Sequence, residues 1–259
     1  MNFLRSASLA FSMFSRIPMP RTDWNEKNMR YMMCAFPLVG VAVGLIVWLW
    51  WRLSLLLELG AFLRAAGLTL LPVAVTGAVH LDGFCDTVDA LASHAPAERR
   101  REILKDPHAG AFAVVGACAY LLLYFALCVE LSPTREAMAL YALGFVLSRS
   151  LSGLSVVSFP ASGNTGLLSM FKASAEKRIS AAALLCMFLL VSVFMVILLP
   201  PVGMLLPLAA LMCFAALYRT AGWEFGGMSG DLAGWFLQLS EISMLAALVL
   251  IQRVVAIWF

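Results

Sequence analysis

Four aspartates, Asp82, Asp86, Asp89 and Asp106, lie within one polar stretch of the chain. The stretch covers residues 80–112 and reads HLDGFCDTVDALASHAPAERRREILKDPHAGAF. Apolar segments on both sides of it are long enough to enter a membrane. Because carboxylates beside a membrane interior are costly to desolvate, something must offset that cost, and a divalent cation is the usual candidate.

The first three aspartates have a spacing that places them on one side of a helix. Positions i, i+4 and i+7 fall within about 60° of one another at 3.6 residues per turn. Like charges on one stripe repel, and a Mg²⁺ ion bridging carboxylates and phosphate oxygens would relieve that repulsion. The alternative is a solvated acidic face, but Phe84, Val88 and Leu91 on the opposite side would pack the helix in place. We therefore predict a magnesium site whose ligands are Asp82, Asp86 and Asp89.

A second group of chemically capable residues follows at Lys105, Asp106 and His108. Asp106 could complete the metal site or act as a general base on an attacking hydroxyl, and His108 could also be that base. Lys105 and the arginines at 99–101 would hold phosphate. The simpler alternatives are an Asp-Pro turn or helix cap for Asp106, and a topology signal facing lipid headgroups for the arginines. Together the two groups indicate a metal-dependent transferase acting on a diphosphate.

The composition indicates a membrane protein. The 259 residues are 62% hydrophobic and 13% charged, about half of the roughly 25% charged residues of a soluble chain. A chain of this length cannot bury so much apolar surface in one core, so it requires lipid. No basic run is interleaved with aromatics, which excludes a nucleic-acid partner. The six cysteines show no CxxC spacing and are typical of small buried hydrophobes.

Charge-free runs predict about seven transmembrane helices. The fold class is an all-α polytopic integral membrane protein, with one membrane-embedded catalytic domain over residues 1–259. Residues 1–14 are expected to form a short interfacial helix, and the run between Arg64 and Asp82 is short for a full span, so its end dips toward the bilayer interior. The remaining spans are expected at 31–51, 109–129 and 138–158, twice within 179–218 where prolines divide the run, and from near Asp231 to near Arg253.

The distribution of basic residues predicts the orientation. With the N-terminus in the cytoplasm, 14 basic residues fall on the cytoplasmic side and 4 on the other. The same orientation brings three segments to the cytoplasmic face: the acidic stretch, the Gly/Ser-rich loop at 159–178 and the GGMSGD turn at 226–231. We expect these to form cytoplasmic catalytic loops.

Weaker candidates lie outside the acidic stretch. Arg149 and Asn164 belong to a segment that suits a loop closing over substrate, although it could equally be a connecting loop. Asp231 is expected to cap a helix. Glu241 is a functional candidate because it lies within a membrane span.

Several motifs, in order along nearly the whole chain, resemble the cobalamin synthase family, the adenosylcobinamide-GDP ribazoletransferases of bacterial vitamin B12 assembly. These are RIPMP at 16–20, PLVG at 37–40, TGAVHLDGFCDTVDAL at 76–91 and KDPHAGAFAV at 105–114. A final GG-GD-G pattern matches Gly226, Gly227, Gly230, Asp231 and Gly234. The departures are mild, but His108 occupies a position that is usually basic in the family.

The resemblance implies a reaction and its partners. A hydroxyl of α-ribazole or its 5′-phosphate attacks adenosylcobinamide-GDP, GMP leaves, and adenosylcobalamin or its 5′-phosphate forms with Mg²⁺. We accordingly expect catalytic roles for Asp82, Asp86, Asp89 and Asp106, and substrate binding by His80, Lys105, His108, Arg149, Asn164 and Asp231. The expected location is the bacterial inner membrane. A homo-oligomer or association with other cobalamin-assembly enzymes is left open.

Two other enzyme classes and one non-enzyme class compete with this interpretation. A CDP-alcohol phosphotransferase would show Ala-Arg after the Asp-Gly and a Gly-x-x-x-Asp-x-x-x-Asp spacing, and neither occurs. An intramembrane prenyltransferase would carry a second aspartate cluster. An ion transporter would place its carboxylates in mid-span on facing helices, whereas these crowd one loop.

Overall fold

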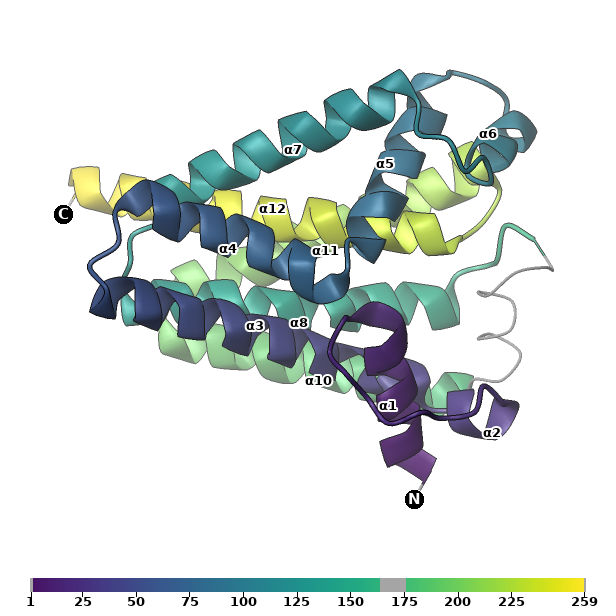
Figure 1. The fold of residues 1–259 in the computed structure, drawn as a ribbon, viewed down its shortest axis with the longest axis horizontal. Coiled ribbons are helices and arrows are strands. Elements are labelled where there is room, and N and C mark those ends of the chain that lie inside the picture. The colour runs from purple at the N-terminus through teal and green to yellow at the C-terminus, as the bar shows by residue number, and fades with distance from the viewer. Residues whose placement is uncertain (1, 164–175, 259) are drawn as a thin grey trace.

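The computed structural model describes residues 2–163 and 176–258, and its long elements are α-helices (Figure 1). They are α1 (Asn2–Phe14), α2 (Glu26–Met29), α3 (Met32–Leu56), α4 (Ala61–Thr76), α5 (Val79–Ala92), α6 (Ala97–Ile103), α7 (Ala111–Glu130), α8 (Arg135–Ser158), α10 (Lys177–Leu198), α11 (Val202–Phe225) and α12 (Gly230–Trp258). The all-α prediction is confirmed.

The predicted membrane spans are present as helices. Within the described ranges, α3, α7, α8, α10, α11 and α12 are long and apolar enough to cross a membrane. Helices α4 and α5 pass the same test only as a pair, which is bent by 93°. The pair accounts for the apolar run that was too short for a full span, and counting it as one span gives the seven that the sequence predicts.

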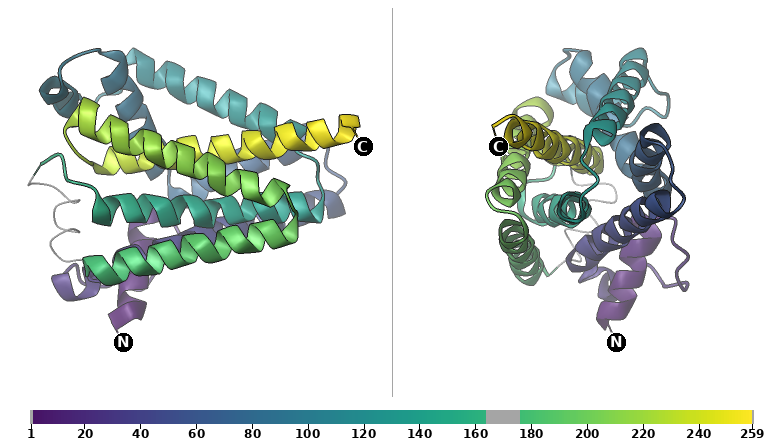
Figure 2. Two further views of the ribbon diagram at one scale, coloured as in Figure 1. Left: turned by 180° about the vertical axis from the view of Figure 1, so that it is seen from behind. Right: turned by 90° about the vertical axis from the view of Figure 1, so that its left-hand side faces the viewer.

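Helix α8 lies at the centre of the bundle and packs against α3, α10, α11 and α12. In the end-on view of Figure 2 it is surrounded by other long helices. Its contact with α3 depends on two glycines of α3, as the small residues there predict. A Cβ on Gly40 would lie 2.3 Å from the Phe145 carbonyl oxygen, and one on Gly44 would lie 2.7 Å from that of Ala142. Only hydrogen at these positions permits so close a backbone approach.

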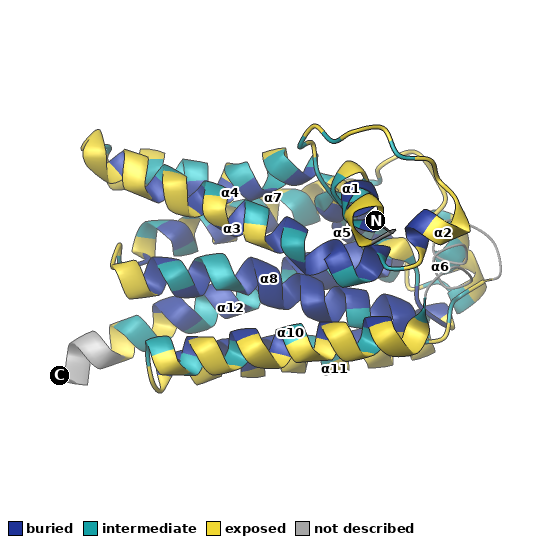
Figure 3. Ribbon diagram, turned by 90° about the horizontal axis from the view of Figure 1, so that it is seen from below, coloured by how far each residue is buried: buried dark blue, intermediate teal, exposed yellow. Residues whose placement is uncertain are grey.

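The outer faces of the bundle expose many apolar side chains. Figure 3 shows the exposed face of α10. A soluble monomer rarely exposes a continuous apolar patch of more than a few hundred Å². Helix α10 alone exposes Leu185, Leu189, Leu190, Val193, Phe194 and Ile197. These faces therefore contact lipid, and the chain is a multi-pass membrane protein.

One end of the bundle holds the polar elements. Helices α1, α2, α5 and α6 gather there, together with the start of α12 and the end of α8 (Figure 1). Segments 160–162 and 226–228 also meet at this end, where Ala161 and Met228 form an isolated β-bridge. The predicted convergence of the acidic stretch, the Gly/Ser loop and the GGMSGD turn is thus confirmed for the part of each that the structure describes.

Candidate active site

A sharp bend between α4 and α5 turns the aspartate-bearing helix across the end of the bundle. Gly77 and Ala78 both have φ of +63°, in the left-handed region. Glycine adopts this conformation freely, whereas an L-residue such as alanine pays about 1 kcal/mol. Arg16 supports the bend, because its backbone N–H donates to the Val75 carbonyl oxygen at 2.7 Å and its side chain lies against Gly77. The RIPMP segment therefore helps to fix the orientation of α5.

Two glycines bring α5 and α12 into backbone contact. A Cβ on Gly83 would lie 2.8 Å from the Asp231 Cα, and one on Gly234 would lie 2.9 Å from the His80 carbonyl oxygen. Any larger side chain at either position would separate the helices. The close crossing places Asp82 beside Asp231 although they come from distant parts of the chain.

A pocket of about 440 Å³ opens beside this crossing, a size that suits a small-molecule ligand. Its polar side includes Asp82, Arg101, Lys105, Ser229 and Asp231. Its apolar lining includes Met13 and Phe14 of α1 and Met33 and Phe36 of α3. Of the predicted site residues, the structure brings His80, Asp82, Lys105 and Asp231 together in this wall.

The other two aspartates of α5 lie farther along the stripe. Asp86 is half-buried, and the negative charges of Asp82, Asp231 and Asp89 all act on it. The Asp89 carboxylate lies against the start of α7, where a Cβ on Gly110 would be 2.2 Å from both of its oxygens. Seven residues of helix advance about 10 Å, so Asp82 and Asp89 are roughly that far apart along the axis. Because Mg²⁺ holds its ligand oxygens at about 2 Å, one ion cannot bind both directly.

The donor set fits an open magnesium site. Over the ranges 2–163 and 176–258, no three His, Cys, Asp or Glu side chains are arranged to hold one metal ion. Magnesium commonly takes only one or two protein carboxylates and completes its shell with water and substrate phosphates. Asp82 together with Asp86 or Asp231 matches that pattern. Asp82, Asp86 and Asp89 could therefore not all bind one ion directly, and which of them hold metal stays a prediction.

The three consecutive arginines point to different partners. Arg101 lines the pocket, and its Nη1 donates to the Phe225 carbonyl oxygen at 3.0 Å. Arg100 is mostly buried and pairs with Glu224, which ties α6 to α11. Arg99 lies on the surface and pairs with Glu102 of the same helix, at 2.7 Å. Arg101 and Lys105 are therefore the cations of this segment that can meet a phosphate in the pocket.

The start of α12 contributes a helix N-terminus to the pocket wall. Ser229, rather than the predicted Asp231, caps this helix, because the Leu232 N–H donates to the Ser229 Oγ at 3.2 Å. Asp231 lies in the first helical turn instead. Ser229, Gly230 and Asp231 all line the pocket, so the positive end of the helix dipole is at hand for an anion.

Asp106 and His108 form a contact with each other outside the pocket wall. Both side chains are exposed, and the Asp106 Oδ1 accepts from the His108 backbone N–H at 3.0 Å and lies 2.8 Å from the His108 Nδ1. These bonds, the backbone one foremost, hold the pKa of Asp106 below its usual value. The carboxylate form is therefore the one that the loop favours. Their predicted catalytic and binding roles stay predictions.

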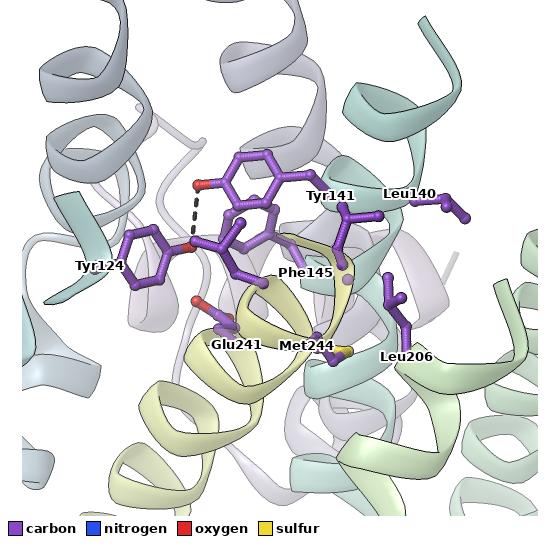
Figure 4. Close-up of a pocket in the computed structure, with 10 residues that line it drawn as sticks. Tyr124, Leu140, Tyr141, Phe145, Leu206, Glu241 and Met244 are labelled. Atoms are coloured by element: carbon purple, nitrogen blue, oxygen red, sulfur yellow. Dashed lines mark hydrogen bonds between the residues drawn. The ribbon is translucent and has the colours of Figure 1, made fainter. Parts of the chain in front are cut away.

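Arg149 lies inside the bundle rather than in the pocket wall. Its Nη1 donates to the Glu241 Oε1 at 2.6 Å, and both side chains are almost fully buried, at 1% and 4% exposure. The Ser148 Oγ donates to the same carboxylate oxygen at 3.0 Å. Figure 4 shows Glu241 near the hydrogen-bonded pair Tyr124 and Tyr141, whose hydroxyls are 3.0 Å apart. The structure thus gives Arg149 and Glu241 a shared position that joins α8 to α12.

One predicted residue cannot be placed, and several pocket residues were not predicted. Asn164 lies outside the described residues, although its loop reaches the pocket through Ser162 and Gly163. Phe14 and Phe36 line the pocket but were not singled out as candidates. The available signal was their position, since Phe14 nearly adjoins the RIPMP segment and Phe36 directly precedes PLVG.

The fold and the pocket define a multi-pass membrane protein whose carboxylates and cations meet at one end of the bundle, as an enzyme acting on an anionic substrate requires. A family profile described as cobalamin-5-phosphate synthase matches residues 6–249. The chain therefore belongs to this family, and it is a transferase of the final step of cobalamin assembly, as the motifs predicted.

Individual relatives agree with the family. A protein of Lachnoclostridium phytofermentans named adenosylcobinamide-GDP ribazoletransferase is 42% identical, over 98% of this chain and 97% of its own length. Proteins of the same name from Clostridium perfringens and Listeria welshimeri are 30% and 32% identical, over 93% and 96% of this chain and 96% and 98% of their own lengths. No solved structure matches the chain.

Proposed function

We propose that the pocket joins adenosylcobinamide-GDP to α-ribazole or α-ribazole 5′-phosphate. The acceptor hydroxyl attacks the phosphorus on the cobinamide side and loses its proton to a base. The bond from that phosphorus to the bridging oxygen breaks, and GMP leaves with this oxygen. The observation that carries the proposal is the meeting of Asp82 and Asp231 with Arg101 and Lys105 in one pocket.

The roles of these residues follow from their charge and position. Phosphoryl transfer needs mainly positioning and charge neutralisation. Arg101, Lys105 and the N-terminus of α12 would hold the diphosphate oxygens. Asp82, with Asp86 or Asp231, would hold Mg²⁺, which when bound offsets phosphate charge.

The remaining predicted residues would act at the edge of this centre. Asp89 would reach the same ion only through water, because it lies two helical turns from Asp82. Asp106 and His108 remain the candidate bases, because they closely follow Lys105 in the loop that leads from the pocket wall to α7.

We further propose that the pocket faces the cytoplasm from the inner membrane. Basic residues concentrate at the pocket end, and removing the buried Arg149 from the count leaves that excess large. Association with a second copy or with other cobalamin-assembly enzymes stays a prediction.

The direct test is GMP release from adenosylcobinamide-GDP by the purified protein, with α-ribazole and with or without magnesium. We expect release to need both, and Asp82→Ala to lower the rate at least about a thousandfold, the scale of losing a positioned charged group at a transferred phosphoryl. The matched control is Asp23→Ala, because Asp23 is exposed and outside the pocket. Wild-type protein that releases no GMP would overturn the function, and an active, folded Asp82→Ala variant would remove Asp82 from the metal site.

A further inference from the structure

Three aromatic rings from three helices form one side of the pocket. Phe14 of α1, Phe36 of α3 and His80 of α5 all belong to its wall. The Phe14 and Phe36 ring centroids are 4.3 Å apart, and the His80 ring lies 6.0 Å from Phe14, nearly parallel to it, and 5.8 Å from Phe36. The rings therefore form a compact aromatic cluster, which we call the Phe14–Phe36–His80 wall; Phe14 is its most exposed member, because Phe36 and His80 are almost fully buried behind it.

His80 has an unsatisfied polar atom within this wall. The residue is 5% exposed, and its Nε2 is buried with no hydrogen-bond partner among the residues that the structure describes. Buried polar atoms are nearly always paired, so an unpaired one in a pocket wall needs an explanation. A ligand in the pocket could supply that partner, and because Nε2 has almost no accessible surface, the ring must first turn toward the cavity.

The two sides of the pocket suit the two substrates differently. A diphosphate is costly to desolvate against Met13, Met33 and phenylalanine rings, and it gains charge-assisted contacts beside Arg101 and Lys105. The flat, uncharged base of a nucleoside is more stable on the apolar side, because there it buries apolar area and stacks on aromatic rings. The corrin ring with its amide side chains is much larger than a nucleoside and belongs outside the apolar side.

We propose that the Phe14–Phe36–His80 wall is the acceptor subsite. The benzimidazole base of α-ribazole lies against the Phe14 ring, which Phe36 supports from behind, and the His80 Nε2 forms a hydrogen bond with a ribose hydroxyl. This inference rests on the proposed function and assigns it a binding subsite. It also gives α1 a purpose in the site, because the C-terminal end of that helix supplies one of the rings.

The first test replaces the flat ring of Phe14 with an apolar side chain of similar bulk. Phe14→Leu should raise the KM for α-ribazole about tenfold, within the range of about 5- to 150-fold expected for losing one base–aromatic stack. The KM for adenosylcobinamide-GDP should change by less than about twofold, because the variant leaves the charged side intact. Phe3→Leu is the matched control, because Phe3 lies on the same helix, is exposed and is outside the pocket wall.

The second test isolates the nitrogen of His80. His80→Phe keeps a ring but removes Nε2, whereas His80→Gln keeps a polar atom in a similar place. Calorimetric titration of α-ribazole alone, without donor or magnesium, should show affinity reduced about tenfold by His80→Phe and partly restored by His80→Gln. Thermal unfolding of each variant in detergent shows whether it is folded.

The outcomes separate this inference from the proposed function. Suppose that the wild type releases GMP. The subsite alone would be overturned if Phe14→Leu left the KM for α-ribazole unchanged, or raised the KM for adenosylcobinamide-GDP instead. Equal α-ribazole affinities for wild type and His80→Phe would overturn the hydrogen bond. A wild type that neither binds α-ribazole nor releases GMP would overturn the function as well.

Discussion

The contact between α5 and α12 predicts that Gly83→Ala lowers the kcat for GMP release while the protein still folds. A methyl group at Gly83 would lie 2.8 Å from the Asp231 Cα and 2.9 Å from its carbonyl oxygen. Both distances are at least 0.5 Å short of the 3.4 Å at which ordinary van der Waals contact begins. The obstacle is backbone, which cannot turn aside, so α5 and α12 must separate by about that amount. Asp82 and Asp231 then move apart at the polar side of the pocket.

The expected losses in kcat and in the free energy of unfolding can be estimated separately. A misplacement of about 1 Å can cost about a hundredfold in rate, so the kcat for GMP release should fall by about 10- to 100-fold. Overpacking costs about 1–3 kcal/mol, while replacing glycine with alanine inside a helix returns up to about 1 kcal/mol. The free energy of unfolding should therefore fall by about 3 kcal/mol or less.

The assay is the initial rate of GMP release together with thermal unfolding in detergent. Gly222→Ala is the matched control, because this glycine is also helical and a Cβ there would meet nothing within 4 Å. It should keep the wild-type rate with equal or higher stability. A Gly83→Ala variant with the wild-type kcat would refute the idea that the helix contact positions the two carboxylates.

Two further predictions address the bundle core and the orientation. Arg149→Ala should destabilise the protein by about 3–5 kcal/mol, because it leaves the Glu241 carboxylate buried without its partner. The double variant Arg149→Met, Glu241→Gln should recover much of this loss, as measured by thermal unfolding. Equal stability of Arg149→Ala and wild type would contradict the pairing. Glu98→Cys in exposed α6 should resist a membrane-impermeant maleimide added to intact cells and react after lysis, with the parent protein as control; ready labelling of intact cells would reverse the proposed orientation.

Much of the fold was predictable because membrane spans depend on local composition. A span needs about 20 apolar residues in sequence, and that condition can be checked without knowing any partner. The run before Asp82 was too short for a full span, and the structure divides it at the bend between α4 and α5. A span was expected at 138–158, but the central place of α8 was not predictable, because Arg149 and several serines make it the least apolar of the six long helices.

Arg149 shows why the role of a charged residue inside a helical bundle cannot be predicted from its sequence neighbours. Its nearest polar partner across helices is Glu241, which lies 92 residues away in sequence. Sequence alone marks both as unusual in an apolar setting but does not pair them. A charged residue in a span therefore indicates either a substrate site or a buried partner, and only the helix arrangement decides between these.

The aspartate stripe shows a related limit at the pocket itself. The i, i+4, i+7 spacing correctly places three carboxylates on one face of a helix. Residues on the same face can still lie far apart along the helix axis. Asp82 and Asp89 lie about 10 Å apart along the axis, so the sequence-based set of three ligands is too extended for one ion. Besides Asp86 on its own helix, Asp82 has Asp231 of α12 beside it, because Gly83 allows the backbone of α12 to approach. The pairing at the pocket thus depends on a residue that carries no functional group, which is why the functional groups alone could not predict it.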